Sequence, residues 1–218
     1  QRRGPRRAER KRPDGVSAPL PVRRLVLLRH GQTEYNATGR MQGHLDTDLT
    51  DLGRRQADLA ARELATLRPH RIVTSDLRRA HDTARALGTH AAVSVETDAR
   101  LRETHLGDWQ GLSHTDIDAS APGIRETWRS DSEFRPPGGE SRLDVAARAR
   151  PLVDELLTDA AWTADPVVLV AHGGTIAALT ASLLGLAVES WPVLGGLGNA
   201  SWVQLSRYDS EPPGRLDI

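Results

Sequence analysis

The stretch LVLLRHGQTEYN, residues 25–36, decides the fold of this chain. Its four apolar residues, 25–28, lead directly into Arg29, His30 and Gly31. An apolar run of this length that ends in a glycine turn predicts a buried strand. Because an arginine and a histidine are costly to bury inside a sheet, both are expected just past the carboxyl end of the strand. Open α/β sheets place their binding sites at that edge.

A second apolar run ends in the same way. Residues 166–170 lead into Ala-His-Gly-Gly at 171–174, and a helix is predicted from Thr175 onward. If the two strands are parallel neighbours, His30 and His172 meet at one edge of the sheet. Glycine-rich turns let backbone N–H groups approach an anion, and a helix N-terminus carries partial positive charge. One such histidine would be an ordinary packed side chain, but two at equivalent strand ends indicate an anion-binding site.

The rest of the chain alternates helices with strands. Thr50 is expected to cap an amphipathic helix that Pro69 ends, and Gly88 is expected to end the next helix. The stretch 101–139 is rich in glycine and proline, which predicts a long functional or mobile loop. This alternation predicts an α/β fold, a three-layer sandwich with a mostly parallel central sheet and helices on both faces. The expected strands cover 22–29, 72–74, 93–95, 166–170 and 201–205, and the expected helices cover 51–68, 77–87, 124–129, 140–157 (kinked at Pro151) and 175–184.

Charge and cysteine content exclude several classes of protein. Residues 1–21 hold seven basic and two acidic residues, which leaves 22 basic and 27 acidic residues in 22–218. The larger part is therefore mildly acidic, which argues against nucleic acid as its main partner. The chain has no cysteine, so disulfides, thiolate metal sites and a cysteine nucleophile are excluded.

The chain is expected to consist of a basic, disordered tail over 1–21 and one folded domain over 22–218. An arm that contacts nucleic acid or a membrane surface is the alternative for the tail. No apolar run approaches the length of a membrane span, and the basic start lacks the apolar segment of a signal peptide. We therefore expect a cytoplasmic protein with no membrane partner, and a homodimer stays open.

Motifs for other phosphate and metal chemistries are missing from the sequence. There is no P-loop lysine, no G-x-G-x-x-G after a strand, no H-E-x-x-H and no nucleophile elbow around a serine. The segment 105–118 holds two histidines and three aspartates, which is a conceivable metal cluster without supporting spacing.

The segment RHGQTEYN at 29–36 resembles the histidine phosphatase superfamily, the phosphoglycerate-mutase-like group. Further blocks continue the resemblance in the family's order, over nearly everything from residue 22 onward. They are QGHLDTDLTDLGRRQA (42–57), SDLRRAHDTA (75–84), LRETHLGDWQG (101–111), PPGGES (136–141) and VAHGG (170–174). Within the superfamily, LRETHLGDWQG, ESRLDVAARARPLV (140–153) and GNASW (198–202) look most like the actinobacterial glucosyl-3-phosphoglycerate phosphatases.

The resemblance implies a site for phosphoryl transfer. His30 would attack phosphorus and form a phosphohistidine, and Glu103 would protonate the leaving oxygen and then activate the attacking water. Positively charged and hydrogen-bonding side chains would neutralise the equatorial oxygens, which is the main demand that phosphoryl transfer makes on a protein. This role would fall to Arg29, Arg79 and His172.

The resemblance also implies the walls of the pocket. Arg79 is chosen over Arg78 because it directly precedes an alanine, as in the family's Arg-Ala step. Ordinary local turns are the alternative explanation for the polar loop residues, and the tryptophans are expected to pack in the core or a lid rather than stack on substrate. The implied substrate-binding residues are Asn36, Gln42, Gly43 and Gly173.

Loop length favours a phosphatase over a mutase. Mutases of the family carry a long extra segment between the catalytic glutamate and the second histidine, whereas Glu103 and His172 are only 69 residues apart. The resemblance therefore implies hydrolysis of glucosyl-3-phosphoglycerate or a similar small phosphorylated sugar acid, without a metal or another cofactor. A phosphoglycerate mutase or a broad-specificity acid phosphatase is the alternative, and a non-catalytic phosphate-binding protein is a remote one. Ile176 and Ala177 stand where many relatives carry an arginine, which leaves the contacts to the rest of the substrate open.

Overall fold

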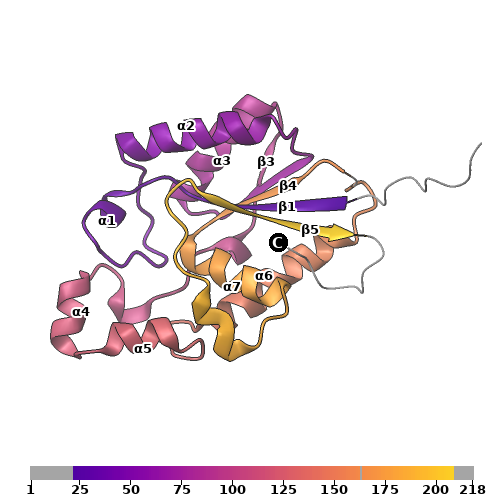
Figure 1. Ribbon diagram of the computed structural model, residues 1–218. Helices are drawn as coiled ribbons and strands as arrows, with labels where there is room; N and C mark the ends of the chain where they lie inside the picture. Colours follow the sequence, from indigo (N-terminus) through magenta and orange to yellow (C-terminus); the bar gives the residue numbers. More distant parts are fainter. Residues whose placement is uncertain (1–21, 163, 209–218) are drawn as a thin grey trace, which may run out of the picture.

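A five-stranded sheet forms the centre of the protein. The computed structural model describes residues 22–162 and 164–208 (Figure 1). The sheet order is β3-β2-β4-β1-β5, and among these strands only β5 runs antiparallel to its neighbour. The strands are β1 (Val22–Arg29), β2 (Arg71–Thr74), β3 (Val95–Thr97), β4 (Val167–Ala171) and β5 (Trp202–Tyr208).

Helices cover both faces of this sheet. In Figure 1, α2 and α3 lie on one face, α6 and α7 lie on the other, and α1, α4 and α5 gather beyond the carboxyl end of β1. The predicted three-layer α/β sandwich is therefore confirmed. The helices are α1 (Glu34–Ala37), α2 (Asp51–Ala65), α3 (Arg78–Ala91), α4 (His114–Ser120), α5 (Ile124–Ser130), α6 (Arg142–Leu157) and α7 (Gly173–Leu183), with short 3-10 turns η1 (Ala99–Leu101), η2 (Gly107–Trp109) and η3 (Val188–Val193).

Strand β1 is buried on both faces because its apolar run has no polar alternation. Leu25 and Leu27 belong to the cluster beneath α6 and α7, whereas Val26 and Leu28 belong to the cluster beneath α2 and α3. All four side chains are at most 1% exposed. A strand that packs on both faces can carry functional groups only where it ends, so the polar residues begin at the sheet edge.

Helix caps largely follow the sequence. Thr50 caps α2 by accepting from the N–H of Gly53, as predicted, and Ser141 caps α6 in a capping box with Asp144. Helix α6 continues through Pro151 to its end. The N-cap position of α7 is occupied by His172, whose side chain makes no capping hydrogen bond.

Three local predictions were wrong. Helix α3 continues past Gly88, because this glycine provides close packing rather than a stop. A Cβ atom there would lie 2.8 Å from both the Val93 carbonyl oxygen and the Val95 side chain. The helix ends instead at Ala91, its C-cap residue Ala92 has φ 55°, and β3 consequently begins two residues later than predicted. Helix α4, capped by Ser113, was not predicted at all.

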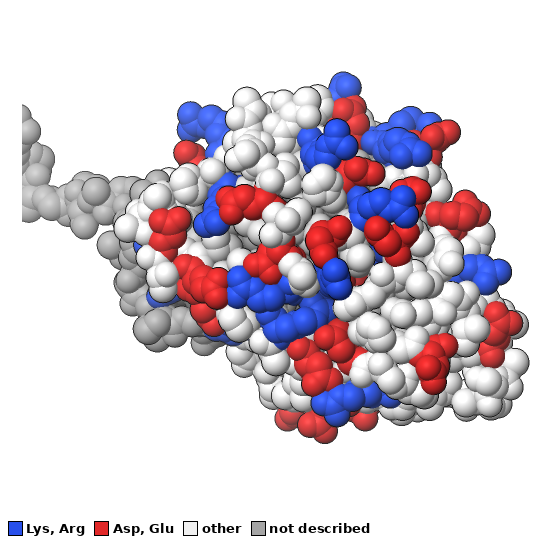
Figure 2. All heavy atoms as spheres, turned by 180° about the vertical axis from the view of Figure 1, so that it is seen from behind, with Lys and Arg blue, Asp and Glu red and all other residues white. Residues whose placement is uncertain are grey.

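The surface of the protein carries mixed charge. On the face that Figure 2 shows, basic and acidic side chains are interspersed rather than separated into patches of one sign. Many of them are paired, such as Arg100 with both Asp98 and Glu155. No helix among residues 22–162 and 164–208 is long and apolar enough to cross a membrane. The predicted basic tail over 1–21 lies outside the described residues.

The loop after β1 packs backbone against backbone on the first turn of α2. A Cβ atom on Gly31 would lie 2.2 Å from the Gly53 carbonyl oxygen, and one on Gly53 would lie 2.0 Å from the Gln32 carbonyl oxygen. The Thr50 N–H donates to that same Gln32 carbonyl at 2.9 Å. Two glycines therefore let α2 hold the loop that follows His30.

Replacement of Gly53 by alanine should destabilise the protein, although glycine-to-alanine changes inside helices usually stabilise. The added methyl group would collide with the Gln32 carbonyl, and overpacking of this kind costs about 1 to 3 kcal/mol of unfolding free energy. Urea denaturation measures the change. Gly196→Ala is the control, because nothing lies within 4 Å of a Cβ atom at that position. A Gly53→Ala variant as stable as the control would contradict the close approach.

Candidate active site

The parallel pairing of β1 with β4 brings two histidines together. Arg29 is in register with Ala171, and the His30 N–H donates to the Ala171 carbonyl at 3.1 Å. The ring centroids of His30 and His172 lie 5.1 Å apart, and both side chains are at most 1% exposed. The expected meeting of the two strand ends at one sheet edge is therefore seen.

The hydrogen bonding of His30 defines its reactive nitrogen. Its Nδ1 lies 2.6 Å from the Gly31 carbonyl oxygen, which can only accept, so Nδ1 carries the proton. The lone pair of a neutral ring is then on Nε2. Burial, followed by the positive charges of Arg79 and Arg29, lowers the pKa of His30 well below its ordinary value. The imidazole is therefore neutral at physiological pH.

Two arginines bring positive charge to the same place. Arg79 is fully buried and donates to the carbonyl oxygens of Leu45 and Gly43, each at 2.8 Å. Arg29 donates to the Leu197 carbonyl oxygen, and the Nε atoms of both arginines are buried without a protein partner among the described residues. Burial lowers the pKa of Arg79 to about 10 and also lowers that of Arg29, so both remain cations at neutral pH.

Neither cation forms an ion pair within the described part of the chain, which favours an anion between them. Arg78, the neighbour rejected from the sequence, has a different role. Its side chain is 55% exposed and pairs with Asp46 and Asp48.

Glu103 occupies the N-terminus of α7. Its carboxyl group accepts hydrogen bonds from the N–H groups of Gly174 at 3.2 Å, Thr175 at 3.1 Å and Thr104 at 2.8 Å. The sequence predicts that the positive end of this helix points to the anion-binding site. The structure instead uses the positive end of the helix to hold the acidic side chain beside the histidines.

His172 lies beside the ring of His30 but is not among the residues that line the pocket there. Neither of its ring nitrogens has a partner among the described residues, although both are buried. Burial, and then the charge of Arg79, lowers its pKa well below the ordinary value for histidine. A neutral imidazole with an unused N–H is a donor for an oxygen atom of a ligand.

A pocket of about 150 Å³ opens at this point. His30, Arg29, Arg79 and Glu103 all line it, together with three of the other residues predicted to bind substrate. The complete lining is Arg29, His30, Asn36, Arg40, Met41, Gln42, Gly43, Arg79, Glu103, Thr104, Leu106, Trp128 and Gly174.

The amide side chains at the pocket are oriented by a network behind them. Asn36 accepts through Oδ1 from the N–H of Thr33 and from Asn199, each at 3.1 Å. Gln42 accepts through Oε1 from the hydroxyls of Thr33 at 2.8 Å and Thr47 at 2.7 Å. With their oxygens engaged, both amides have their N–H donors left for a ligand, since neither donates to any described protein atom.

The two glycines of the His172 turn have different neighbours. A Cβ atom on Gly173, the predicted substrate-binding residue, would lie 3.5 Å from Arg29 Nε. One on Gly174 would lie 2.6 Å from a Glu103 carboxyl oxygen. Gly174 thus lies at the pocket that holds Glu103, whereas Gly173 lies beside Arg29 and lines a separate cavity under η3.

Sequence reasoning missed part of the pocket wall. Arg40 and Thr104 line it, and so does Trp128, which had been expected to pack rather than contact substrate. Trp128 does both, since its ring also lies edge-on to Trp109 with centroids 5.9 Å apart. The capping box at Ser113 was the available signal for α4, which precedes the helix α5 that carries this tryptophan.

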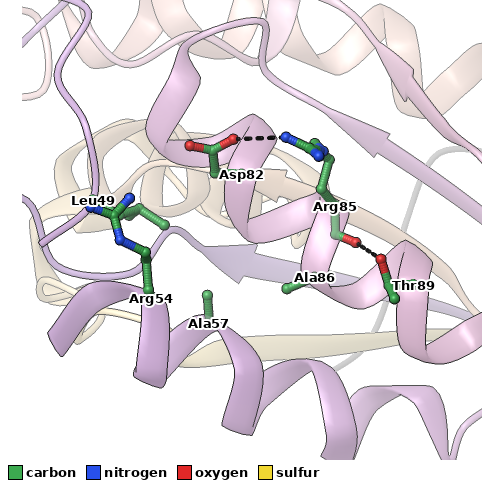
Figure 3. A pocket seen from close by; sticks show the side chains of 7 residues that line it. All are labelled: Leu49, Arg54, Ala57, Asp82, Arg85, Ala86 and Thr89. Carbon is green, nitrogen blue, oxygen red and sulfur yellow. Dashed lines mark hydrogen bonds and ion pairs between the residues drawn. The ribbon is translucent and has the colours of Figure 1, made fainter. Parts of the chain in front are cut away.

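A second pocket lies away from the two histidines. Figure 3 shows a pocket between α2 and α3 that shares no residue with the one around His30. Its charged residues include Arg85 and Asp82, which form an exposed ion pair at 3.7 Å. Such exposed pairs are characteristic of a solvated helix surface.

The conceivable metal cluster over 105–118 is dispersed in the structure. Asp116 caps α4 and Asp118 pairs with Arg125, while His105 packs edge-on against His44. Within the described residues, no group of three or more histidine or acidic side chains is arranged to hold a metal ion.

Comparison with known proteins agrees with this geometry. A glucosyl-3-phosphoglycerate phosphatase of Mycolicibacterium vanbaalenii is 63% identical over 207 residues, which cover 91% of this chain and 92% of that protein. A solved structure of mycobacterial glucosyl-3-phosphoglycerate phosphatase complexed with VO3 is 60% identical, with a TM-score of 0.83 over 86% of this chain and 97% of that one. A structure of the same mycobacterial enzyme with inorganic phosphate is 56% identical, with a TM-score of 0.82 over 90% of this chain and 96% of that one.

The family itself is also matched directly. The model of the histidine phosphatase superfamily (branch 1) matches residues 25–215, so the resemblance predicted from the sequence is confirmed. Because this family model matches most of the chain and the relatives above are similar over nearly their full length, the chain belongs to the histidine phosphatase superfamily.

Proposed function

We propose that the protein hydrolyses a phosphomonoester through a phosphohistidine on His30. The observation that carries this proposal is the placement of His30. Its neutral ring presents an Nε2 lone pair at a pocket lined by Arg29 and Arg79, neither of which forms an ion pair with a carboxylate of the described residues. Negative charge on the transferred phosphoryl group would replace the missing partners, and a nucleophile would already lie beside it.

The reaction would proceed in two displacements. Nε2 of His30 bonds to phosphorus while the bond to the leaving oxygen breaks, and Glu103 supplies the proton that this oxygen needs. A water molecule then gives a proton to Glu103 and attacks phosphorus from the vacated side. The N–P bond breaks, inorganic phosphate leaves, and His30 and Glu103 return to their starting states.

The remaining polar side chains would bind oxygen atoms. Arg29 and Arg79 line the pocket and supply positive charge, and His172, buried beside His30, would supply an N–H. Asn36 and Gln42 can donate their free amide N–H groups because their oxygens are already engaged. Preorganised donors of this kind stabilise transition-state charge without rearrangement during the reaction.

For the substrate we propose glucosyl-3-phosphoglycerate, or a phosphorylated sugar acid like it. Support comes from relatives of that name at 63% identity over nearly the full length of both chains. The pocket is also suitable, because the phosphate end is polar whereas Met41, Leu106 and Trp128 give an apolar wall. A tryptophan ring is a common contact for the apolar face of a sugar.

Brief incubation with phosphate-labelled substrate should leave label on the protein that is lost in acid and kept in base, as expected for a phosphohistidine. His30→Ala should remove both the label and turnover. The control is His90→Ala, because His90 lies on the surface against Asp58. Label that persists in the His30→Ala variant would refute the assignment of the nucleophile.

The ring of His30 should remain neutral in mildly acidic solution. Its ¹³Cε1–¹H signal is expected to stay unshifted between about pH 7.5 and pH 6, where an unperturbed histidine takes up its proton. The unfolded chain does bind protons in this range, so the free energy of unfolding should fall as the pH is lowered through about 6.5. A His30 signal with a midpoint near pH 6.5 would contradict the burial argument.

A kinetic panel tests the substrate. We expect kcat/KM to be highest for glucosyl-3-phosphoglycerate, lower for 3-phosphoglycerate and small sugar phosphates, and measurable for p-nitrophenyl phosphate. Formation of 2-phosphoglycerate from 3-phosphoglycerate would favour a mutase, and equal rates on all substrates would favour a broad-specificity phosphatase. No turnover of p-nitrophenyl phosphate would favour a non-catalytic binding protein.

A further inference from the structure

We propose that His44 and Arg148 are positioning residues that hold the backbone of Glu103 and thereby direct its carboxyl group at the leaving oxygen. This inference rests on the proposed function, in which Glu103 is the proton donor. Neither residue lines the pocket that contains His30. Both would act through Glu103 rather than on the substrate.

The two side chains donate to the same carbonyl oxygen. His44 Nε2 lies 2.7 Å from the Glu103 carbonyl oxygen, and Arg148 Nη2 donates to that oxygen at 2.8 Å. Both lone pairs of the carbonyl are thus used by side chains that come from distant parts of the sequence. A loop residue in a long irregular segment rarely needs two side-chain donors on one carbonyl, unless its position matters.

Arg148 ties Glu103 to helix α6. Its guanidinium group donates to the Arg100 carbonyl oxygen at 2.7 Å and to the carboxyl group of Glu140 at 2.8 and 3.0 Å. Glu140 in turn accepts from the His105 N–H at 2.8 Å. The guanidinium group of Arg148, directly at residue 100 and through Glu140 at residue 105, therefore fixes the backbone on both sides of Glu103. The group is planar and lies on α6, a helix of 16 residues.

His44 ties Glu103 to the loop that carries Gln42 and Gly43. The His44 N–H donates to Gln110 Oε1 at 2.6 Å, and its ring lies edge-on to His105 with centroids 4.8 Å apart. A carbonyl oxygen can only accept, so the proton of the neutral ring is on Nε2. Burial lowers the pKa of His44, so its ring is neutral at pH 7.

The carboxyl end of Glu103 is held independently, by the N–H groups of Gly174 and Thr175. With its backbone fixed by His44 and Arg148 and its carboxyl group fixed by α7, the residue has little freedom left. Proton donors must lie within a few tenths of an ångström of the productive geometry, because small displacements lower the rate steeply. The arrangement is therefore suited to aiming one acid rather than to general stability.

The experiment compares two substrates that differ in their need for an acid. The leaving group of an alkyl phosphate such as glucosyl-3-phosphoglycerate is an alkoxide, which needs the proton. The leaving group of p-nitrophenyl phosphate is a stable phenolate, which does not. His44→Ala should lower kcat/KM for the alkyl phosphate by about 10-fold or more, with about 3-fold or less change for the aryl phosphate. Glu103→Gln should show the same selectivity more strongly.

Two further variants separate positioning from folding. His44→Gln retains a donor near the position of Nε2 and should recover most of the alkyl phosphate activity. Arg148→Lys retains the charge beside Glu140 but loses the fork, so it should show the selective loss. His90→Ala is the matched surface control and should resemble the wild type on both substrates.

The outcomes distinguish this proposal from the proposed function. Equal losses on both substrates in His44→Ala, or no recovery in His44→Gln, would overturn the positioning role while Glu103→Gln remained selective. A Glu103→Gln variant without selectivity would instead overturn the assignment of Glu103 as the acid. A wild type inactive on both substrates would overturn the proposed function itself.

Discussion

The guanidinium groups of Arg29 and Arg79, one partly and one fully buried, form no ion pair with a described carboxylate, and the rest of the structure depends on this constraint. Arg29 and Arg79 lie within the same pocket, and removing such charges from water is expensive unless neutral donors and acceptors surround them. The structure meets this need with backbone carbonyls from Gly43, Leu45 and Leu197. These carbonyls satisfy hydrogen bonds without neutralising the charge, so the pocket keeps its attraction for an anion.

The same constraint shapes the loop after α1. The Gly43 carbonyl reaches Arg79 from a residue with φ 53°, and a Cβ atom at this position would lie 2.3 Å from Gln110 Oε1. The neighbouring residue, His44, then donates to Glu103. Two consecutive residues, Gly43 and His44, therefore connect Arg79 with Glu103, the residue proposed to donate the proton. This explains why the irregular loop after α1 makes so many hydrogen bonds to other parts of the protein.

The parts of the fold that could be predicted are those that local sequence determines. Strand β1 has the predicted bounds because its apolar run is unbroken, and the two histidines meet because parallel strands share an edge. The end of α3 could not be predicted in this way, since long-range packing overrides the local glycine signal at Gly88. Helix α4 had a local signal, the capping box at Ser113, but the glycines and prolines around it predict a loop. Contacts between distant loops could not be predicted from the sequence either. Glu103 lies on the N-terminus of α7, and nothing in either segment alone indicates that pairing.

Strand β5 and the residues before it give the site a dependence on the order of synthesis. The Ser201 carbonyl accepts from the Arg29 N–H at 3.0 Å, the Ala200 N–H donates to the His30 carbonyl at 3.1 Å, and Asn199 bridges that carbonyl to Asn36. His30 is thus translated 169 residues before Asn199, which binds its carbonyl oxygen. During translation, the hydrogen bonds that surround His30 stay incomplete until strand β5 and the residues before it have been made.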